Sequence, residues 1–215
     1  MTAAEDGFSR FQDVVTSLER IREVLREPMP SVVAKQIDHI DDVCRAIIEK
    51  SPFIVIASAD AKGYPDVSPK GDPQGFVRIL DEKHLAIPDR PGNRRVDTFR
   101  NILENPYIAI IFLIPGKGET LRITGECRIV RDAALRESMA VKEKVPDFAV
   151  VVRVERVIIH CPKCVIRAGL WEPDSWPDSS HTPDIGAAMV AHAKLDITPE
   201  QLHDEAIRDG TTTLY

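Results

Sequence analysis

The stretch LRITGECRIV at residues 121–130 alternates between two kinds of side chain along its whole length. One set is mostly apolar and small: Leu121, Ile123, Gly125, Cys127 and Ile129. The other set is polar: Arg122, Thr124, Glu126 and Arg128. A two-residue period is typical of a β-strand, because successive side chains point to opposite faces. We therefore predict a strand here with one face in the core.

Further strand signals lie on both sides of this stretch. Six other short segments are expected as strands, namely residues 53–57, 64–70, 75–80, 84–87, 107–114 and 148–160. Apolar or β-branched residues dominate these segments except 64–70, which is expected as the return strand of a hairpin. Asp60 to Gly63 separates the first two as a hairpin turn, with glycine where a positive φ is favoured. Several antiparallel strands joined by short turns indicate a mainly β fold, either a barrel or a sandwich.

Helical patterns flank and interrupt the predicted strands. Apolar residues recur at three- and four-residue steps from Phe8 to Leu25, and again within residues 38–50. Two helices are expected within the β region, at residues 93–103 and 132–141. Two short helices are expected between Asp184 and Asp209.

These patterns predict three parts of the chain. Residues 1–50 would form an N-terminal helical arm for packing or dimerisation. Residues 51–172 would form the barrel domain. Residues 173–215 would form a C-terminal helical tail packed on the barrel.

Composition narrows the class of protein. The 215 residues are 43% hydrophobic and 29% charged, as in globular proteins. A net charge of −6 argues against a general nucleic-acid binder, which carries a basic surface. No run approaches 18 apolar residues, and the N-terminus lacks an apolar signal core, so we expect a cytoplasmic protein without a membrane span. Four cysteines are too few for a disulfide scaffold.

The segment IPDRPGNRR at residues 87–95 carries the strongest chemical signal. It leaves a predicted strand and enters a predicted helix, for which Asn93 is a good N-cap. Arg94 and Arg95 at a helix N-terminus are unusual, because that end already carries partial positive charge. With Arg90 and free backbone N–H groups they predict a phosphate site. The alternative is a solvated basic turn whose arginines pair with Asp89 or Asp97.

A second segment, DVSPKGD at residues 66–72, offers a hydroxyl at Ser68 and an ammonium at Lys70. Both segments end strands of the predicted barrel, so we expect them to converge at one mouth.

A third segment, HCPKC at residues 160–164, could hold zinc or carry out redox chemistry. Zinc usually requires four ligands, whereas Cys44 and Cys127 fit core positions better. We favour a turn into a helix at Pro162. The sequence lacks the motifs of α/β-hydrolases, zinc proteases, Rossmann folds and P-loop proteins.

Taken together, these motifs resemble the FMN-binding split-barrel proteins of the pyridoxamine 5′-phosphate oxidase superfamily, over roughly residues 52–172. Asn93-Arg94-Arg95 is similar to the family's phosphate-binding triplet, and Asn105-Pro106 follows the helix as in the family. Residues 119–125, ETLRITG, are similar to the next family strand, with Thr120 where glutamine is common.

The resemblance implies an antiparallel Greek-key split barrel and a homodimer with FMN at the subunit interface. Residues implied to hold the phosphate and ribityl chain are Ser68, Lys70, Arg90, Asn93, Arg94, Arg95 and Thr98. Pro69, Pro88 and Asp89 would lie near the flavin ring. Thr120, Arg122, Lys163 and Trp171, with Arg167 as a weaker candidate, would approach the ring, some from the other subunit.

The resemblance also implies the function, an FMN-binding flavoprotein that acts as an FMN-dependent oxidoreductase on a small molecule. Oxidation of pyridoxamine phosphate is not expected, because the tail lacks an Arg-x-His motif. No side chain is assigned as catalytic. Three alternatives stay open: a non-catalytic flavin carrier or sensor, a deazaflavin (F420)-dependent reductase, and a zinc module built on Cys161 and Cys164.

Overall fold

The computed structural model describes residues 7–215 and divides at Lys35–Gln36 into two compact units. The first unit contains two short helices, α1 (Leu18–Arg22) and α2 (Pro30–Ala34), neither of which has a buried residue. The helix predicted from Phe8 is therefore much shorter than expected, because a helix without a packed apolar face gains little stability. The expected three-part division of the chain stays a prediction.

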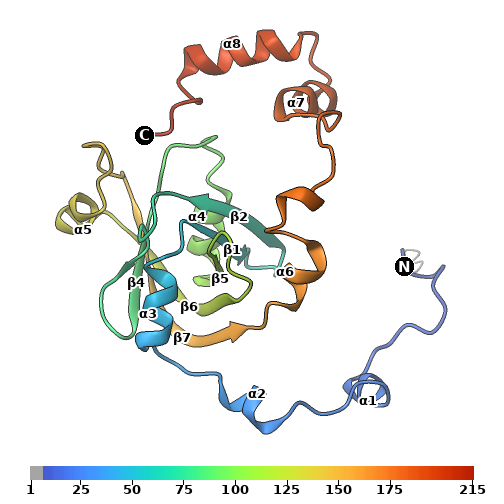
Figure 1. Ribbon diagram of the computed structural model, residues 1–215. Helices are drawn as coiled ribbons and strands as arrows, with labels where there is room; N and C mark the ends of the chain where they lie inside the picture. Colours follow the sequence, from blue (N-terminus) through green and yellow to red (C-terminus); the bar gives the residue numbers. More distant parts are fainter. Residues whose placement is uncertain (1–6) are drawn as a thin grey trace. The chain divides into compact units, whose positions relative to one another are not determined.

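The second unit contains a single antiparallel sheet of seven strands, in the order β2-β1-β5-β6-β7-β4-β3. The strands are β1 (Phe53–Ala59), β2 (Pro65–Gly71), β3 (Arg78–Ile79), β4 (His84–Pro88), β5 (Tyr107–Leu113), β6 (Thr120–Val130) and β7 (Ala149–His160). The sheet curls into a split β-barrel (Figure 1), which confirms the predicted fold class. The predicted strands are present, with bounds that differ by a few residues.

The predicted alternation along β6 is confirmed. Leu121, Ile123 and Cys127 are buried, whereas Arg122 and Arg128 are exposed. The buried positions of β1, β5, β6 and β7 meet in one core, whose largest fully buried members include Ile54, Ile110, Phe112, Leu121, Ile123 and Val152.

Helix α3 (Asp42–Ile48) adds Cys44, Ile47 and Ile48 to this core, and the Asp41 side chain caps it. Burial raises the pKa of the Cys44 and Cys127 thiols to about 12, so both stay protonated. The prediction that these two are core cysteines is confirmed.

Strand β2 forms one edge of the sheet and holds Pro65 and Pro69, which an edge strand tolerates because it needs no second ladder of hydrogen bonds. Asp66, Ser68 and Lys70 share the less exposed face of this strand. Because side chains alternate along β2, the carboxylate of Asp66, the hydroxyl of Ser68 and the ammonium of Lys70 lie on the same face of this edge strand.

The remaining helices cover the barrel and form the C-terminal segment: α4 (Asp97–Glu104), α5 (Ala133–Ser138), α6 (Lys163–Ala168), the 3-10 turn η1 (Pro173–Ser175), α7 (Ile185–Ala193) and α8 (Pro199–Asp209). The side chain of Asn101 in α4 donates to Ser58 Oγ at 3.0 Å, and both residues are buried. This contact anchors α4 to β1. Helix α8 begins with a capping box formed by Thr198 and Gln201.

Among residues 7–215, none of the helices has the length and apolar character needed to traverse a lipid bilayer.

Candidate functional site

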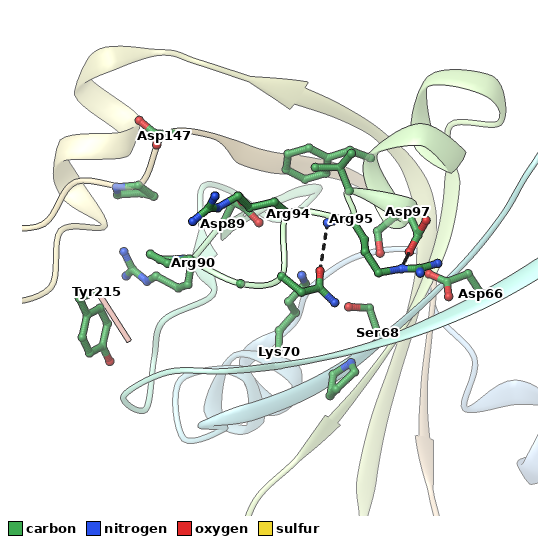
Figure 2. A pocket seen from close by; sticks show the side chains of 18 of the residues that line it. Asp66, Ser68, Lys70, Asp89, Arg90, Arg94, Arg95, Asp97, Asp147 and Tyr215 are labelled. Carbon is green, nitrogen blue, oxygen red and sulfur yellow. Dashed lines mark hydrogen bonds and ion pairs between the residues drawn. The ribbon is translucent and has the colours of Figure 1, made fainter. Parts of the chain in front are cut away.

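A cavity of about 720 Å³ opens where β2 faces the loop after β4. Residues 66–70 and 89–95 of the two predicted segments line it, so the predicted convergence is observed (Figure 2). Nine of the predicted site residues are among its lining: Ser68, Pro69, Lys70, Asp89, Arg90, Asn93, Arg94, Arg95 and Thr98. The barrel thus brings together residues from an edge strand, a loop and a helix.

The loop between β4 and α4 has an unusual backbone. Arg94 and Val96 have φ angles of 59° and 54°, in the left-handed region that residues other than glycine seldom adopt and β-branched ones such as valine rarely adopt. Each such residue costs on the order of 1–3 kcal/mol, and strain of this kind clusters at functional sites.

The prediction that Asn93 caps the helix is wrong. Asn93 Oδ1 instead accepts the N–H of Arg95 at 3.1 Å, and α4 begins only at Asp97. The reason is local: Arg94 and Val96 each adopt a left-handed backbone conformation before the backbone becomes helical.

The N-terminus of α4 faces the cavity and no side chain caps it. The first N–H groups of a helix have no partner inside the helix, and the helix dipole adds partial positive charge there. Asp97, Thr98 and Phe99 line the cavity at this end. Bare amides at a positive helix end are suited to an anion.

The three arginines of the loop each pair with a carboxylate. Arg95 Nε lies 2.7 Å from Asp97 Oδ2, and Arg94 Nη2 lies 3.0 Å from Asp209 Oδ2. The alternative prediction of a self-paired basic turn therefore holds for Arg95. The Arg94 and Arg95 side chains are 64% and 70% exposed, so these pairs are weak and open to exchange with an incoming anion.

Arg90 is held differently. Its Nε lies 2.6 Å from Asp72 Oδ2, its Nη2 donates to the carbonyl of Met139 at 2.7 Å, and the Asp72 side chain is 1% exposed. Asp72 and Met139 thus fix the Arg90 side chain in place at the cavity. Lys70 and Lys144 also line the cavity, and neither forms an ion pair within the described part of the chain.

Asp89 is an acidic group within this basic site. Burial raises the pKa of its carboxyl, the nearby Asp147 adds to the rise, and the charges of Lys70 and Arg90 oppose it. Asp89 therefore holds its proton to higher pH than an ordinary aspartate does.

This shift predicts a pH-dependent gain in stability for Asp89→Asn. Because the pKa is raised in the folded state, the folded protein binds the proton more tightly, and stability falls as pH rises through the folded pKa. The variant lacks this loss, so its advantage over wild type should grow from acidic to neutral pH. Urea unfolding at several pH values measures it. Asp174→Asn, at an exposed residue of η1, should stay within about 0.5 kcal/mol of wild type throughout; an equal gain there would contradict the prediction.

Several residues that line the cavity were not predicted from the sequence. Lys144, Val145, Pro146 and Asp147 precede β7, and Tyr215 is the last residue of the chain. The charged residues around Val145-Pro146 were a usable signal for a loop at the same barrel mouth. Nothing local marks Tyr215, because only folding brings it to the cavity.

Other predicted residues lie outside the cavity lining. Pro88 is the buried last residue of β4, next to Asp89. On β6, Thr120 pairs with His160 and Arg122 is exposed. Lys163 begins α6, which also holds the exposed Arg167, and Trp171 Nε1 donates to the carbonyl of Lys117 at 2.9 Å. Their cofactor roles stay predictions.

In the third segment, Cys161 and Cys164 are both exposed, and neither forms a disulfide. Lys163–Ala168 forms α6, which confirms the predicted turn into a helix at Pro162. Within residues 7–215, no group of three or more histidine, cysteine or acidic side chains is placed to hold a metal ion.

The fold and the cavity together define a class: a split-barrel protein with a basic strand-to-helix turn at its open mouth. The sequence profile of the pyridoxamine 5′-phosphate oxidase family matches residues 40–161, more than half of the chain. The protein belongs to this family.

Several solved structures are similar to this chain. A HupZ variant from Group A Streptococcus is 25% identical, with 56% of this chain and 99% of that chain covered and a TM-score of 0.46. A putative pyridoxamine 5′-phosphate oxidase from Lactobacillus delbrueckii is 20% identical, with 57% and 95% covered and a TM-score of 0.46. The heme storage protein HutZ from Vibrio cholerae is 13% identical, with 57% and 94% covered and a TM-score of 0.40. No curated protein matches the sequence.

Proposed function

We propose that the protein binds FMN in the cavity between β2 and α4 and is an FMN-dependent oxidoreductase for a small molecule. The observation that carries this proposal is the uncapped N-terminus of α4, which faces the cavity beside Arg94, Arg95 and Lys70. Amides at a helix N-terminus and guanidinium groups are the donors that bind a phosphate monoester. Family membership supports the same ligand.

The cavity suits the rest of such a ligand. Its volume falls within the range of about 300–1,000 Å³ that is common for small-molecule sites. Val67, Pro69, Val145 and Pro146 provide apolar lining beside the charged groups, which favours a flat ring attached to a polar chain. The carboxylates of Asp97 and Asp209 do not prevent binding, because their arginine partners are mostly exposed.

The protein's own residues would bind and orient this ligand. FMN, when bound, supplies hydride and electron transfer. Ser68, Lys70, Arg94 and Arg95 would hold its phosphate end, while Arg90 stays fixed by Asp72. Asp89 retains a proton at its carboxyl above the usual pH for aspartate, and it lies in the same cavity.

The proposal includes a homodimer. The outer face of β1 and β5 exposes Phe53, Tyr107 and Ile111, and Val55 pairs with Ile111 across the two strands. A second copy packed on this face would remove the apolar side chains from water. It would also allow Arg122, Lys163 or Trp171 of one copy to approach the cavity of the other. Sedimentation equilibrium tests this part, and a monomer at micromolar concentration would contradict it.

Flavin binding is tested by reconstitution of the purified protein. We expect uptake of added FMN with visible absorbance bands and quenched flavin fluorescence, and weaker binding of riboflavin, which lacks the phosphate. Absence of flavin uptake would overturn the proposal. Bound FMN that NAD(P)H never reduces, across a broad panel of acceptors, would leave a carrier or sensor, and preferential binding of F420 would indicate a deazaflavin-dependent reductase.

A further inference from the structure

The C-terminal end of the chain contacts the cavity at two places. Asp209 is the last residue of α8. Arg94 Nη2 lies 3.0 Å from its carboxylate oxygen Oδ2 and donates a hydrogen bond to its backbone carbonyl at 2.8 Å. The Tyr215 hydroxyl donates to Asp72 Oδ1 at 2.7 Å. The other oxygen of Asp72 accepts from Arg90. Gly210 and Tyr215 themselves line the cavity.

The Tyr215 ring is held by charge as well. The guanidinium of Arg90 lies 5.7 Å from its centroid, and Lys142 Nζ lies 5.4 Å from it. Contacts of this kind between a cation and an aromatic ring are attractive. Figure 2 shows Tyr215 beside Arg90, at the end of the cavity away from Ser68 and Asp66.

The rest of the C-terminal segment contributes little to its attachment. Helices α7 and α8 pack against each other, and neither contains a buried residue. Segments with few buried apolar contacts open at low free-energy cost. The polar contacts of Asp209 and Tyr215 therefore carry much of the attachment to the barrel.

Asp209 forms an ion pair with the Arg94 guanidinium, which a bound phosphate would also contact. The Nη2 group of Arg94 donates to the backbone carbonyl of Asp209 and forms an ion pair with its carboxylate, so this residue already engages that end of the guanidinium. A phosphate that binds through the same Nη2 group must replace at least one of these contacts, and a phosphate at the other nitrogens would be repelled by the adjacent Asp209 carboxylate. Because the ion pair is exposed, a dianionic ester can displace the carboxylate.

We propose that residues 209–215 form a C-terminal strap that competes with the ligand's phosphate for Arg94 and is released from Arg94 when the phosphate binds. This inference rests on the proposed function for the identity of the ligand. The strap would make phosphate-bearing ligands weaker than the cavity alone allows, and it would leave ligands without a phosphate unaffected.

The first test compares Asp209→Asn with wild type in the full-length protein. Loss of the competing charge should tighten FMN binding about two- to fivefold, the range that an exposed ion pair supports. Riboflavin affinity should not change. Asp204→Asn is the matched control, because it removes the same charge from an exposed position on α8 that forms no ion pair with the described residues. Equal FMN affinity in wild type and Asp209→Asn, or an equal gain in Asp204→Asn, would overturn the strap.

The second test follows the strap itself by limited trypsin digestion at Arg208, the residue before Asp209. Ligand binding should speed this cleavage, since release of Asp209 frees the end of α8. FMN and inorganic phosphate should both have this effect, and riboflavin should not. Protection of Arg208 by either anion would show that the segment closes over the ligand, and would overturn the proposal.

The digestion experiment with inorganic phosphate distinguishes failure of the strap from failure of the proposed cofactor. If the wild-type protein takes up no FMN, the proposed cofactor is wrong, yet inorganic phosphate still tests whether an anion releases Asp209. If FMN binds and neither affinity nor cleavage depends on Asp209, the cofactor stands and the strap fails.

Discussion

Arg94→Glu and Arg95→Glu should each weaken FMN binding at least tenfold. Each substitution removes a charge-assisted hydrogen bond worth about 1.5–3 kcal/mol and places a negative charge beside the phosphate. Both side chains lie at the cavity and are largely exposed, so neither change disturbs the barrel core. Isothermal titration or flavin fluorescence measures the effect.

Two controls make this result specific. Riboflavin lacks the phosphate, so its affinity should change much less than that of FMN in both variants. Arg156→Glu reverses a charge at an exposed position on β7 outside the cavity lining and should leave FMN affinity near that of wild type. If both cavity variants kept wild-type affinity for FMN, the phosphate would bind elsewhere.

Gly125→Ala should destabilise the barrel strongly. A Cβ atom at this position would lie 2.1 Å from the backbone oxygen of Arg153 and 3.2 Å from a methyl group of Val152. Both neighbours belong to β7, and the pairing of β6 with β7 shifts register between Thr124 and Gly125. Backbone cannot move aside as a flexible side chain can, so the close approach requires glycine.

The expected loss is about 2 kcal/mol or more, and for a chain of this size each kcal/mol lowers the Tm by roughly 2–4 °C. Gly71→Ala is the matched control, because its added Cβ would meet only Phe53 and Pro52 at ordinary contact distances of 3.5 and 3.7 Å. Thermal unfolding followed by circular dichroism compares the two. Similar melting temperatures for both variants would show that β6 and β7 can separate at the bulge.

Much of the barrel is predictable from local pattern. The alternation along residues 121–130, the apolar run at residues 53–57 and the valine-rich stretch before His160 all form the expected strands. Burial of Cys127 follows from the two-residue period of β6, and burial of Cys44 follows from the three- and four-residue steps of α3. These features are predictable because a buried face imposes its period directly on the order of residues.

The candidate site was predictable in part. The hydroxyl and ammonium of β2 and the arginines of the following loop could be found from their places at strand ends, and they do converge. The start of α4 could not be predicted, because the Asn93 side chain accepts a hydrogen bond from the N–H of Arg95 and does not cap the helix. Local propensity does not decide between a helix cap and a tight turn.

By itself, the sequence determined the strands, the core positions and the chemical character of the groups at the mouth, because each depends on residue type and on spacing over a few residues. Only the tertiary structure decided which carboxylates meet those cations. Asp209 lies 115 residues from Arg94 in the chain, and Tyr215 lies 143 residues from Asp72. Contacts between positions so far apart leave no local period, since they arise only when the closed barrel and the returning C-terminal segment bring the two ends of the site together.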